Sequence, residues 1–467
     1  MRKNDIGVIG LAVMGSNLAT NIANHGYFVS VFNRTAQKTK DFLKNHPNKN
    51  IIPYFSINDF VNSLSSPRCI ILMVQSGIAT DNTIQSIIPH LHSNDIIVDG
   101  GNSFYQDTIQ RHQNLLKKKI NFIGMGISGG EYGALTGPAI MPGGDKKIYD
   151  IISPIFTSIA AKYNDESCIN YIGPDGSGHY VKMVHNGIEY ADMQIIAETY
   201  TILKNILFLS NQEISEIFNT WNQGELKSYL LDITKNILLK KEGKYDLIDL
   251  ILDEACSKGT GIWTCQDALN LHESLTMITS SVFSRFLSSL KSQRMLASKI
   301  LSSPKIIPVL CNQVEFIEQL RQALYLSKII SYAQGFSQLS IASKKYNWNL
   351  KFYNIAKIFR SGCIIQADIL NHIVKVYKYD NNIINLLLSP YFQSIANSYH
   401  ISLRSVISYT IQQGISIPTF SSAISYYDGY RTAQSSANLI QAQRDYFGSH
   451  TYKRCDKSGI YHTNWLQ

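Results

Sequence analysis

Residues 6–26, IGVIGLAVMGSNLATNIANHG, decide the fold because they join a strand to a helix through a glycine turn. The turn has the spacing Gly10-x-Ala12-x-x-Gly15, a dinucleotide-binding pattern with alanine in its middle position. Gly10 permits the tight turn and Gly15 permits close helix packing, so backbone N–H groups at the helix start can face a pyrophosphate. The stretch predicts a dinucleotide site, with a glycine turn that binds nothing as the alternative.

Short runs of β-branched and apolar residues recur in the first part of the chain. After residues 6–10 they fall at 28–32, 70–74, 96–100 and 121–125, and helical patterns separate them. This alternation predicts a parallel sheet covered by helices. The N-terminal part is therefore expected to be an α/β domain of the Rossmann type.

The remainder of the chain has a different period. Strand-like runs largely stop after Asp175, and long amphipathic patterns continue to about residue 435, so this part should be nearly all helix. The segment GPDGSG at 173–178 is the natural hinge because it is rich in glycine. We expect a dinucleotide-binding domain at 1–176, an all-helical domain at 177–435 and a C-terminal tail at 436–467.

The helical part shows signs of an internal duplication. Tyr190-Ala191 recurs as Tyr332-Ala333 at an offset of 142, and ISEIF from Ile214 recurs as IAKIF from Ile355 at an offset of 141. Two matches at nearly one spacing predict a repeat. Chance similarity between amphipathic helices is the alternative.

Composition excludes several classes of protein. The 467 residues are 45% hydrophobic and 16% charged, which is typical of a globular chain with two or three domains. The net charge of +9 comes without a long basic run or interleaved aromatics, so it favours an anionic small molecule over nucleic acid. Seven cysteines without a C-x-x-C pair argue against disulfides or structural zinc, and we see no metal-ligand cluster. No apolar run is long enough to span a bilayer, so we expect a cytoplasmic protein.

The second strand predicts which dinucleotide binds. It ends at Asn33, where a protein that binds NAD usually offers a carboxylate to the ribose. Here Arg34 and Thr35 follow instead, and a guanidinium can hold a 2′-phosphate with two parallel hydrogen bonds. Lys38, one turn further on, could add positive charge, although a solvated lysine is the commoner outcome. The predicted cofactor is NADP.

Three more loops follow strands and should lie at the same edge of the sheet. They are MVQSG at 73–77, DGGNS at 99–103 and the glycine-rich segment that begins at Gly124. Ligands bind at strand ends in open α/β sheets. Within the last loop, Ser128-Gly129-Gly130 presents a hydroxyl and unhindered N–H groups that suit a carboxylate or oxyanion.

The stretch KMVHNGIEY, residues 182–190, gathers chemically active side chains on one helix face. In a helix, Lys182, His185, Asn186 and Glu189 form a single stripe over two turns. An ordinary amphipathic surface helix is the alternative. At the offset of 142, the stripe becomes Leu324, Ser327, Lys328 and Ser331, so only the first copy keeps its chemistry.

A family resemblance extends along nearly the whole chain. It is carried, in order, by GLAVMGSNLA, DGGNS, GISGGEYGA, KMVHNGIEY, SKGTGIW and IQAQRDYFGSH. These motifs are similar to those of the decarboxylating 6-phosphogluconate dehydrogenases. The resemblance implies oxidation of 6-phosphogluconate by NADP, followed by loss of carbon dioxide to give ribulose 5-phosphate.

The resemblance also implies catalytic roles. Lys182 would be the general base for the substrate's 3-hydroxyl, and Glu189 would protonate the carbon that lost its carboxylate. A free lysine has a pKa of about 10.4, so burial or nearby positive charge must lower it.

The implied binding residues form two sets. The cofactor set is Gly10, Leu11, Ala12, Val13, Met14, Gly15, Asn33, Arg34, Thr35, Lys38, Met73, Val74, Gln75 and Asn102. The substrate set is Asn102, Ser128, Gly129, Gly130, His185, Asn186, Glu189, Tyr190, Lys258, Thr260, Arg285, Arg444 and His450, of which Tyr190, Lys258, Thr260 and Arg285 would hold the 6-phosphate. Arg285 taken alone could equally be a surface ion-pair partner.

The tail carries the implied partner contact. In the family it crosses the neighbouring subunit, so Arg444 and His450 would complete the partner's site in an obligate homodimer. The helical domain would then serve both substrate binding and dimerisation. Gly448, which ends a helical stretch, and the polar residues after it suit an extended arm.

This sequence departs from the family pattern at a few positions. Gln75 and Ile262 stand where lysine is common, and Tyr132 stands where glutamate is common. Lost positive charge at Gln75 and Ile262 predicts weaker cofactor binding or an altered dependence on salt. The rival interpretations are another β-hydroxyacid dehydrogenase, such as a 3-hydroxyisobutyrate type, and an NADP-binding regulator. The apparent duplication and the late IQAQRDYFGSH motif disfavour the first, and the presence of Lys182 and Glu189 disfavours the second.

Overall fold

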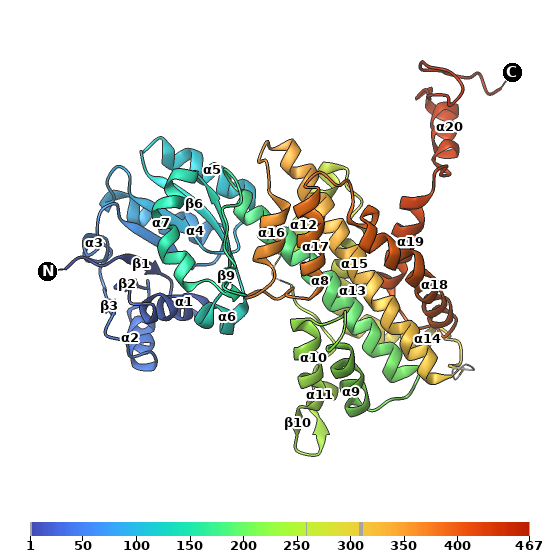
Figure 1. The fold of residues 1–467 in the computed structure, drawn as a ribbon, viewed down its shortest axis with the longest axis horizontal. Helices are drawn as coiled ribbons and strands as arrows, with labels where there is room; N and C mark the ends of the chain where they lie inside the picture. Colours follow the sequence, from blue (N-terminus) through green and yellow to red (C-terminus); the bar gives the residue numbers. More distant parts are fainter. Residues whose placement is uncertain (1, 258, 308–311, 467) are drawn as a thin grey trace.

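The computed structural model describes residues 2–257, 259–307 and 312–466. Figure 1 shows a sheet flanked by helices in the N-terminal part and a group of helices in the rest, with α20 (Ala437–Gly448) standing apart from both. This arrangement confirms the predicted Rossmann-type domain followed by a helical domain. None of the helices in the described ranges combines the length and the apolar character that crossing a membrane requires.

The N-terminal part is built on a seven-stranded sheet in the order β3-β2-β1-β4-β5-β6-β7. Its strands are β1 (Ile6–Ile9), β2 (Val29–Phe32), β3 (Ile51–Pro53), β4 (Cys69–Leu72), β5 (Ile96–Asp99), β6 (Asn121–Ser128) and β7 (Ala139–Gly144). Its helices are α1 (Val13–Asn24), α2 (Ala36–Asn45), α3 (Ile57–Asn62), α4 (Ile78–Ile87), α5 (Tyr105–Leu116), α6 (Gly130–Thr136) and α7 (Lys146–Ile159). The pairs from β3 through β6 are parallel, so the loops after β1, β4 and β5 meet at one edge.

The five predicted strands are parallel, but the sheet ends in a strand, β7, that was not predicted and is not parallel. β7 pairs with β6 in the antiparallel direction, with Ser128 opposite Ala139. Only residues 129–138 connect the two strands. A parallel crossover needs about a dozen or more residues, so this connection can only reverse the chain. The three-residue β3 was also absent from the predicted strands, because it is too short for a periodic pattern to show.

The C-terminal part is nearly all helix, as predicted. Its helices are α8 (Ser177–Asn205), α9 (Asn211–Trp221), α10 (Tyr229–Leu239), α11 (Leu247–Leu250), α12 (Thr260–Leu271), α13 (Thr276–Ser288), α14 (Lys291–Ile300), α15 (Gln313–Lys345), α16 (Phe352–Ile358), α17 (Ile369–Tyr379), α18 (Pro390–Gln412), α19 (Pro418–Arg431) and α20. Short hairpins lie before and within it: β8 (Lys162–Tyr163) with β9 (Glu166–Ser167), and β10 (Lys241–Glu242) with β11 (Tyr245–Asp246).

Two pairs of helices in this part begin at the predicted spacing. α16 begins 141 residues after α9 (352 against 211), and α19 begins 142 residues after α13 (418 against 276). The long helices α8 and α15 pack against each other, as do α13 and α19. This order and spacing are those that an internal duplication predicts, and we propose one.

The segment 173–178, the predicted hinge, is closely packed at its end. α8 already begins at Ser177, and a Cβ added at Gly178 would lie 2.4 Å from the carbonyl oxygen of Met141 in β7. Glycine at position 178 is therefore needed for the close approach of helix and sheet, and the hinge stays a prediction. One apolar core includes Tyr105 and Met141 of the first part together with most buried residues of the helices, so the two parts pack closely. We still propose the boundaries at 176 and 435, which fall next to the start of α8 and between α19 and α20.

Candidate active site

The glycine turn after β1 has the geometry of a dinucleotide cradle. Gly10 has a φ of +100°, and a Cβ added at Gly15 would lie 1.8 Å from the carbonyl oxygen of Gly10. Neither position tolerates a side chain. The backbone N–H of Leu11 donates to Oδ1 of Asn33 over 3.0 Å, so Asn33 ties the end of β2 to the turn. The N-terminus of α1 is thereby fixed for a pyrophosphate.

The side chains after β2 fit a phosphorylated ribose. Arg34, Thr35 and Lys38 are all exposed around the start of α2, and the first turn of that helix has no acidic residue. The loop after β4 borders the same turn, because a Cβ at Gly10 would meet the carbonyl oxygen of Met73 at 2.4 Å. These residues therefore suit NADP in charge and in shape.

Lys182 is buried where α8 crosses β6. The residue is 6% exposed, and a Cβ added at Gly126 of β6 would lie 2.5 Å from its own Cβ. Burial lowers the pKa of Lys182, and the negative charge of Glu189 works in the opposite direction. The alternative of an amphipathic surface helix is wrong, because Met183, Val184 and His185 beside it are buried as well.

His185 and Asn186 continue the stripe. Nδ1 of His185 lies 3.2 Å from Oδ1 of Asn186, and Nε2 lies 3.3 Å from Oγ of Ser128. Burial and the neighbouring Lys182 keep the pKa of His185 well below its usual value, so its imidazole is neutral. Since Oδ1 can only accept, Nδ1 donates to Asn186 and the hydroxyl of Ser128 donates to Nε2. Oε2 of Glu189 is 3.7 Å from Nδ1, on the half-buried end of the stripe.

Four of the predicted residues meet in one narrow crevice between the sheet edge and the helices. It is lined by Asn102, Ser103, His179, Lys182, Met183, Asn186, Thr260 and Trp263. Asn102, Lys182, Asn186 and Thr260 were predicted. Ser103 and Trp263 were not, although they lie inside the motifs DGGNS and SKGTGIW, which was the available signal. His179 lies just before KMVHNGIEY and was missed because a lone buried histidine carries no motif.

A cation–aromatic pair follows at the end of the stripe. The guanidinium carbon of Arg285 on α13 is 3.4 Å from the centre of the Tyr190 ring, and its Nη1 donates to the carbonyl of Cys256 over 3.3 Å. Its partner is thus an aromatic ring rather than the surface carboxylate of the alternative interpretation. Lys258, predicted beside it, lies outside the described residues. Gly129 and Gly130 follow Ser128 at the start of α6.

The tail residues lie away from this crevice. Arg444 and His450 are exposed, and Nη1 of Arg444 donates to Gln441 of the same helix. Figure 1 shows α20 projecting from the helical part. The three departures from the family pattern also lie near the surface: Gln75 and Tyr132 are exposed, and Ile262 is half-buried.

Fold and site together define a dehydrogenase that uses a nicotinamide dinucleotide and carries a buried lysine at the junction of sheet and helices. Residues 5–173 match the family described as the NAD binding domain of 6-phosphogluconate dehydrogenase, and residues 178–465 match its C-terminal domain. The chain belongs to the 6-phosphogluconate dehydrogenase family.

Individual relatives agree over the full length. The chain is 62% identical over 466 residues to the decarboxylating 6-phosphogluconate dehydrogenase of Buchnera aphidicola subsp. Baizongia pistaciae, with 100% of both chains covered. It is 57% identical over 469 residues to that of Escherichia coli strain K12, again with 100% of both covered. A solved structure of Plasmodium falciparum 6-phosphogluconate dehydrogenase, studied in its apo form, with its cofactor NADP⁺ and with its substrate 6-phosphogluconate, has a TM-score of 0.95 at 41% identity and covers 99% of this chain and 100% of its own.

Proposed function

We propose that this chain oxidises and decarboxylates 6-phosphogluconate to ribulose 5-phosphate and carbon dioxide, with reduction of NADP, as a step of the pentose phosphate pathway. The observation that carries the proposal is Lys182, a buried amine with a lowered pKa in the crevice between the dinucleotide cradle and the helices. A lysine so placed can be neutral often enough to act as a base. The family membership supplies the substrate.

The cofactor would be held by residues of the sheet edge. The glycine turn from Gly10 to Gly15 and the N-terminus of α1 would take the pyrophosphate, with Arg34, Thr35 and Lys38 at the 2′-phosphate. The loop after β4, Met73 to Gln75, and Asn102 would border the nicotinamide end. When bound, NADP supplies the acceptor for the hydride.

The proton steps belong to α8. Lys182 would take the proton of the 3-hydroxyl as carbon 3 is oxidised, and the protonated amine would then stabilise the new carbonyl oxygen while the carboxylate leaves as carbon dioxide. The product of that loss is an enediol. Glu189, two turns away on the same helix, would deliver a proton to the carbon that lost the carboxylate.

Substrate binding would use the crevice and its rim. His185, Asn186, Asn102 and the Ser128-Gly129-Gly130 segment would hold the hydroxyls and the carboxylate. The neutral imidazole of His185 suits this task, because it can donate or accept without adding charge. The 6-phosphate would rest on Tyr190, Lys258, Thr260 and Arg285.

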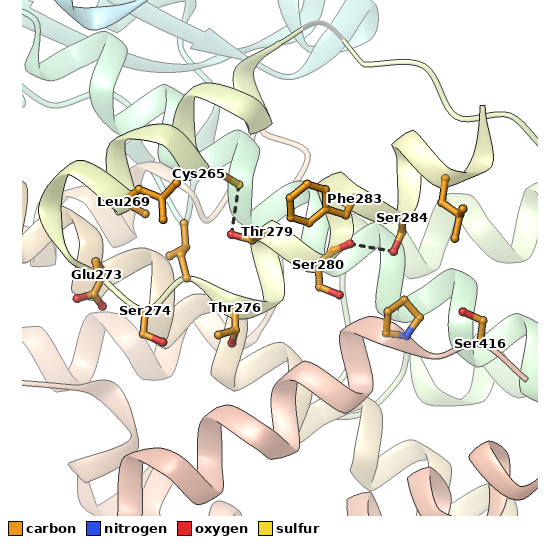
Figure 2. Close-up of a pocket in the computed structure, with 14 residues that line it drawn as sticks. Cys265, Leu269, Glu273, Ser274, Thr276, Thr279, Ser280, Phe283, Ser284 and Ser416 are labelled. Atoms are coloured by element: carbon orange, nitrogen blue, oxygen red, sulfur yellow. Dashed lines mark hydrogen bonds between the residues drawn. The ribbon is translucent and has the colours of Figure 1, made fainter. Parts of the chain in front are cut away.

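We also propose that the active form is a homodimer in which Arg444 and His450 enter the neighbouring site. α20 projects with Leu439, Ile440 and Phe447 exposed. A cavity of about 670 Å³ lies where α12, α13 and the start of α19 meet, and its lining includes the exposed Leu269 and Phe283 (Figure 2). Apolar surfaces of this kind favour contact with a second copy of the chain. A cytoplasmic location stays a prediction.

The assay that tests the function follows absorbance of reduced nicotinamide with 6-phosphogluconate and either NADP or NAD. We expect reduction with NADP and release of carbon dioxide in equal amount. Absence of a signal with both cofactors would reject the substrate, and a signal with NAD alone would reject the role of Arg34.

Subunit mixing tests the dimer. Lys182→Met and Arg444→Ala should each inactivate the pure enzyme. Hybrids formed by dissociating and reassociating the two variants should regain activity, because one site of the hybrid contains a native Lys182 and a native Arg444. Hybrids that form but stay inactive would show that Arg444 does not act on the neighbouring site.

A further inference from the structure

Two loops beside the crevice meet at one buried arginine. Arg111 lies on α5, outside every motif used above, and is only 6% exposed. Its guanidinium reaches the end of the loop after β4 and the loop after β5. The first loop contains Met73 to Gln75, and the second contains Asn102.

The contacts with the first loop hold its far end. Nη2 of Arg111 donates to the carbonyl of Gly77 over 3.2 Å, and Nε donates to Asp81 in the first turn of α4 over 2.7 Å. The hydroxyl of Thr80 in the same turn donates to the carbonyl of Gln75 over 3.0 Å. Arg111 thus anchors the turn of α4 that fixes the backbone of Gln75.

The contacts with the second loop flank Asn102. Nη1 of Arg111 donates to Oγ of Ser103 over 3.3 Å and lies 3.5 Å from Oδ2 of Asp99. The carboxylate of Asp99 accepts the N–H of Gly101 over 3.0 Å and the hydroxyl of Ser103 over 2.7 Å. Both neighbours of Asn102 are therefore tied to the carboxylate that faces Arg111.

The same network reaches the helix that carries Lys182. The backbone carbonyl of Asp99 accepts a hydrogen bond from Nε2 of His179 over 3.1 Å, and the hydroxyl of Thr108 lies 2.7 Å from Nδ1. His179 precedes Lys182 by one turn of α8, and Thr108 precedes Arg111 by one turn of α5. Burial lowers the pKa of His179, so the ring is neutral and Nδ1 can accept from Thr108.

We propose that Arg111 is a positioning residue for the reaction: it fixes the spacing between the loop after β4, which borders the cofactor turn, and the loop that presents Asn102 beside Lys182. The proposal rests on the function proposed above. Arg111 touches neither the glycine turn nor Lys182 directly, and acts through Gly77, Asp81, Ser103 and Asp99. A lysine keeps the charge, but its single ammonium cannot bridge acceptors on two loops in the way a planar guanidinium does.

The chain offers a matched control at the other end of the same strands. Arg68 is also buried, and its Nη1 pairs with Oδ2 of Asp95 over 2.9 Å. These residues come just before β4 and β5, whereas Arg111 contacts the segments that follow β4 and β5. Arg68→Lys therefore makes the same chemical change at the opposite end of β4 and β5, away from the crevice.

The experiment compares Arg111→Lys with Arg68→Lys by NADP dissociation constant, kcat, KM for 6-phosphogluconate, the isotope effect with substrate deuterated at carbon 3, and Tm. We expect Arg111→Lys to weaken NADP binding and lower kcat by about tenfold each, which is less than the roughly 100-fold that a misplacement of reacting groups by about 1 Å can cost. Its isotope effect should rise, because hydride transfer becomes more strongly limiting. Arg68→Lys should lower Tm at most, with native binding and kinetics.

Equal changes in the two variants, or a change of Tm alone in Arg111→Lys, would overturn the proposal. Ser103→Ala provides a second variant if Arg111→Lys does not fold, because it removes one acceptor of Arg111 and one donor to Asp99. We expect Ser103→Ala to lower kcat by a smaller factor than Arg111→Lys. Native kinetics in Ser103→Ala would also overturn the proposal. NADP binding is measured without substrate. A wild type that binds NADP but does not oxidise 6-phosphogluconate would reject the proposed function, while the binding comparison would still decide the role of Arg111.

Discussion

The two long helices of the helical part each bury a lysine, and the two lysines differ in what surrounds them. Lys182 on α8 is 6% exposed, lines the crevice and forms none of the ion pairs found among the described residues. Lys328 on α15 is 2% exposed and donates to the buried carboxylate of Asp192 on α8. At the repeat offset of 142, Lys328 stands where α8 has Asn186.

The difference distinguishes a structural charge, Lys328, from the proposed general base, Lys182. A buried charge with a hydrogen-bonded partner can remain charged and hold two helices together. Burial lowers the pKa of an amine that has no such partner, because its charged form loses its solvation. A general base requires a pKa lowered in this way. If a duplication produced the two helices, α15 kept the packing and placed its lysine in the core, while α8 kept the crevice.

The largest expected effect is the loss of kcat when Lys182 is replaced. Lys182→Met should lower kcat by about 10³-fold, within the range that general acid–base groups contribute. Stability should not fall, because burial lowers the pKa and the charged form is therefore disfavoured in the folded state. In the wild type, this group adds stability as pH rises from the lowered pKa towards the unfolded value of about 10.4.

Rates and melting curves of Lys182→Met across pH measure both effects. In the wild type, kcat/KM should fall as pH drops through the lowered pKa of Lys182. A variant that melts well below the wild type while retaining its kcat would reverse the assignment of the two lysines.

The next effect concerns Lys328. Lys328→Met leaves Asp192 buried without a cation, which should reduce the free energy of unfolding by about 3–5 kcal/mol. Chemical denaturation measures the loss, and kcat of the folded enzyme should stay close to native. The double variant Lys328→Met with Asp192→Leu should recover part of the stability, because no unpaired charge remains. Full stability in the single variant would show that the ion pair is dispensable.

Glu198 is, like Lys182 and Asp192, a buried ionisable residue of α8, and it should make the stability of the fold depend on pH. Glu198 accepts the backbone N–H groups of Thr419 and Phe420 at the start of α19, each over 2.9 Å, and burial raises its pKa to about 7. A raised pKa favours folding below the unfolded value of about 4.3, and this stability is lost as pH rises through about 7. The loss should approach about 3 kcal/mol. Unfolding between pH 5 and 8 measures it in the wild type, and Glu198→Gln should flatten that part of the curve.

The smallest expected effect distinguishes the proposed role of Glu189 from that of Lys182. Glu189→Gln should retain hydride transfer better than overall product formation, by about tenfold, because it removes the proposed acid for the last step only. Transient NADPH formation compared with ribulose 5-phosphate release measures the ratio. Ser331, which holds the corresponding place on α15, gives the control: Ser331→Ala should leave both rates native. Equal losses in the two steps of Glu189→Gln would reject its separate role.

Much of the fold was readable from local patterns. The glycine turn, the alternating strands and the long helical periods each depend on neighbouring residues, so they identified the Rossmann-type domain and the helical domain. The antiparallel β7 was not readable in this way, because strand direction depends on the length and path of a connection. The close contact at Gly178 was unreadable for a related reason: the sequence shows that a side chain is missing, and only the packing shows that β7 lies where it would be.

The sequence by itself determined the chemical groups of the site and their order along α8, since helical spacing alone puts Lys182, His185, Asn186 and Glu189 on one face. Only the tertiary structure decided that this face is buried against β6, and burial is what lowers the pKa of Lys182. The tertiary structure also decided that Lys328 pairs with Asp192 and that Arg111 contacts two loops. These contacts connect residues far apart in the chain, and no local pattern encodes the distance between them.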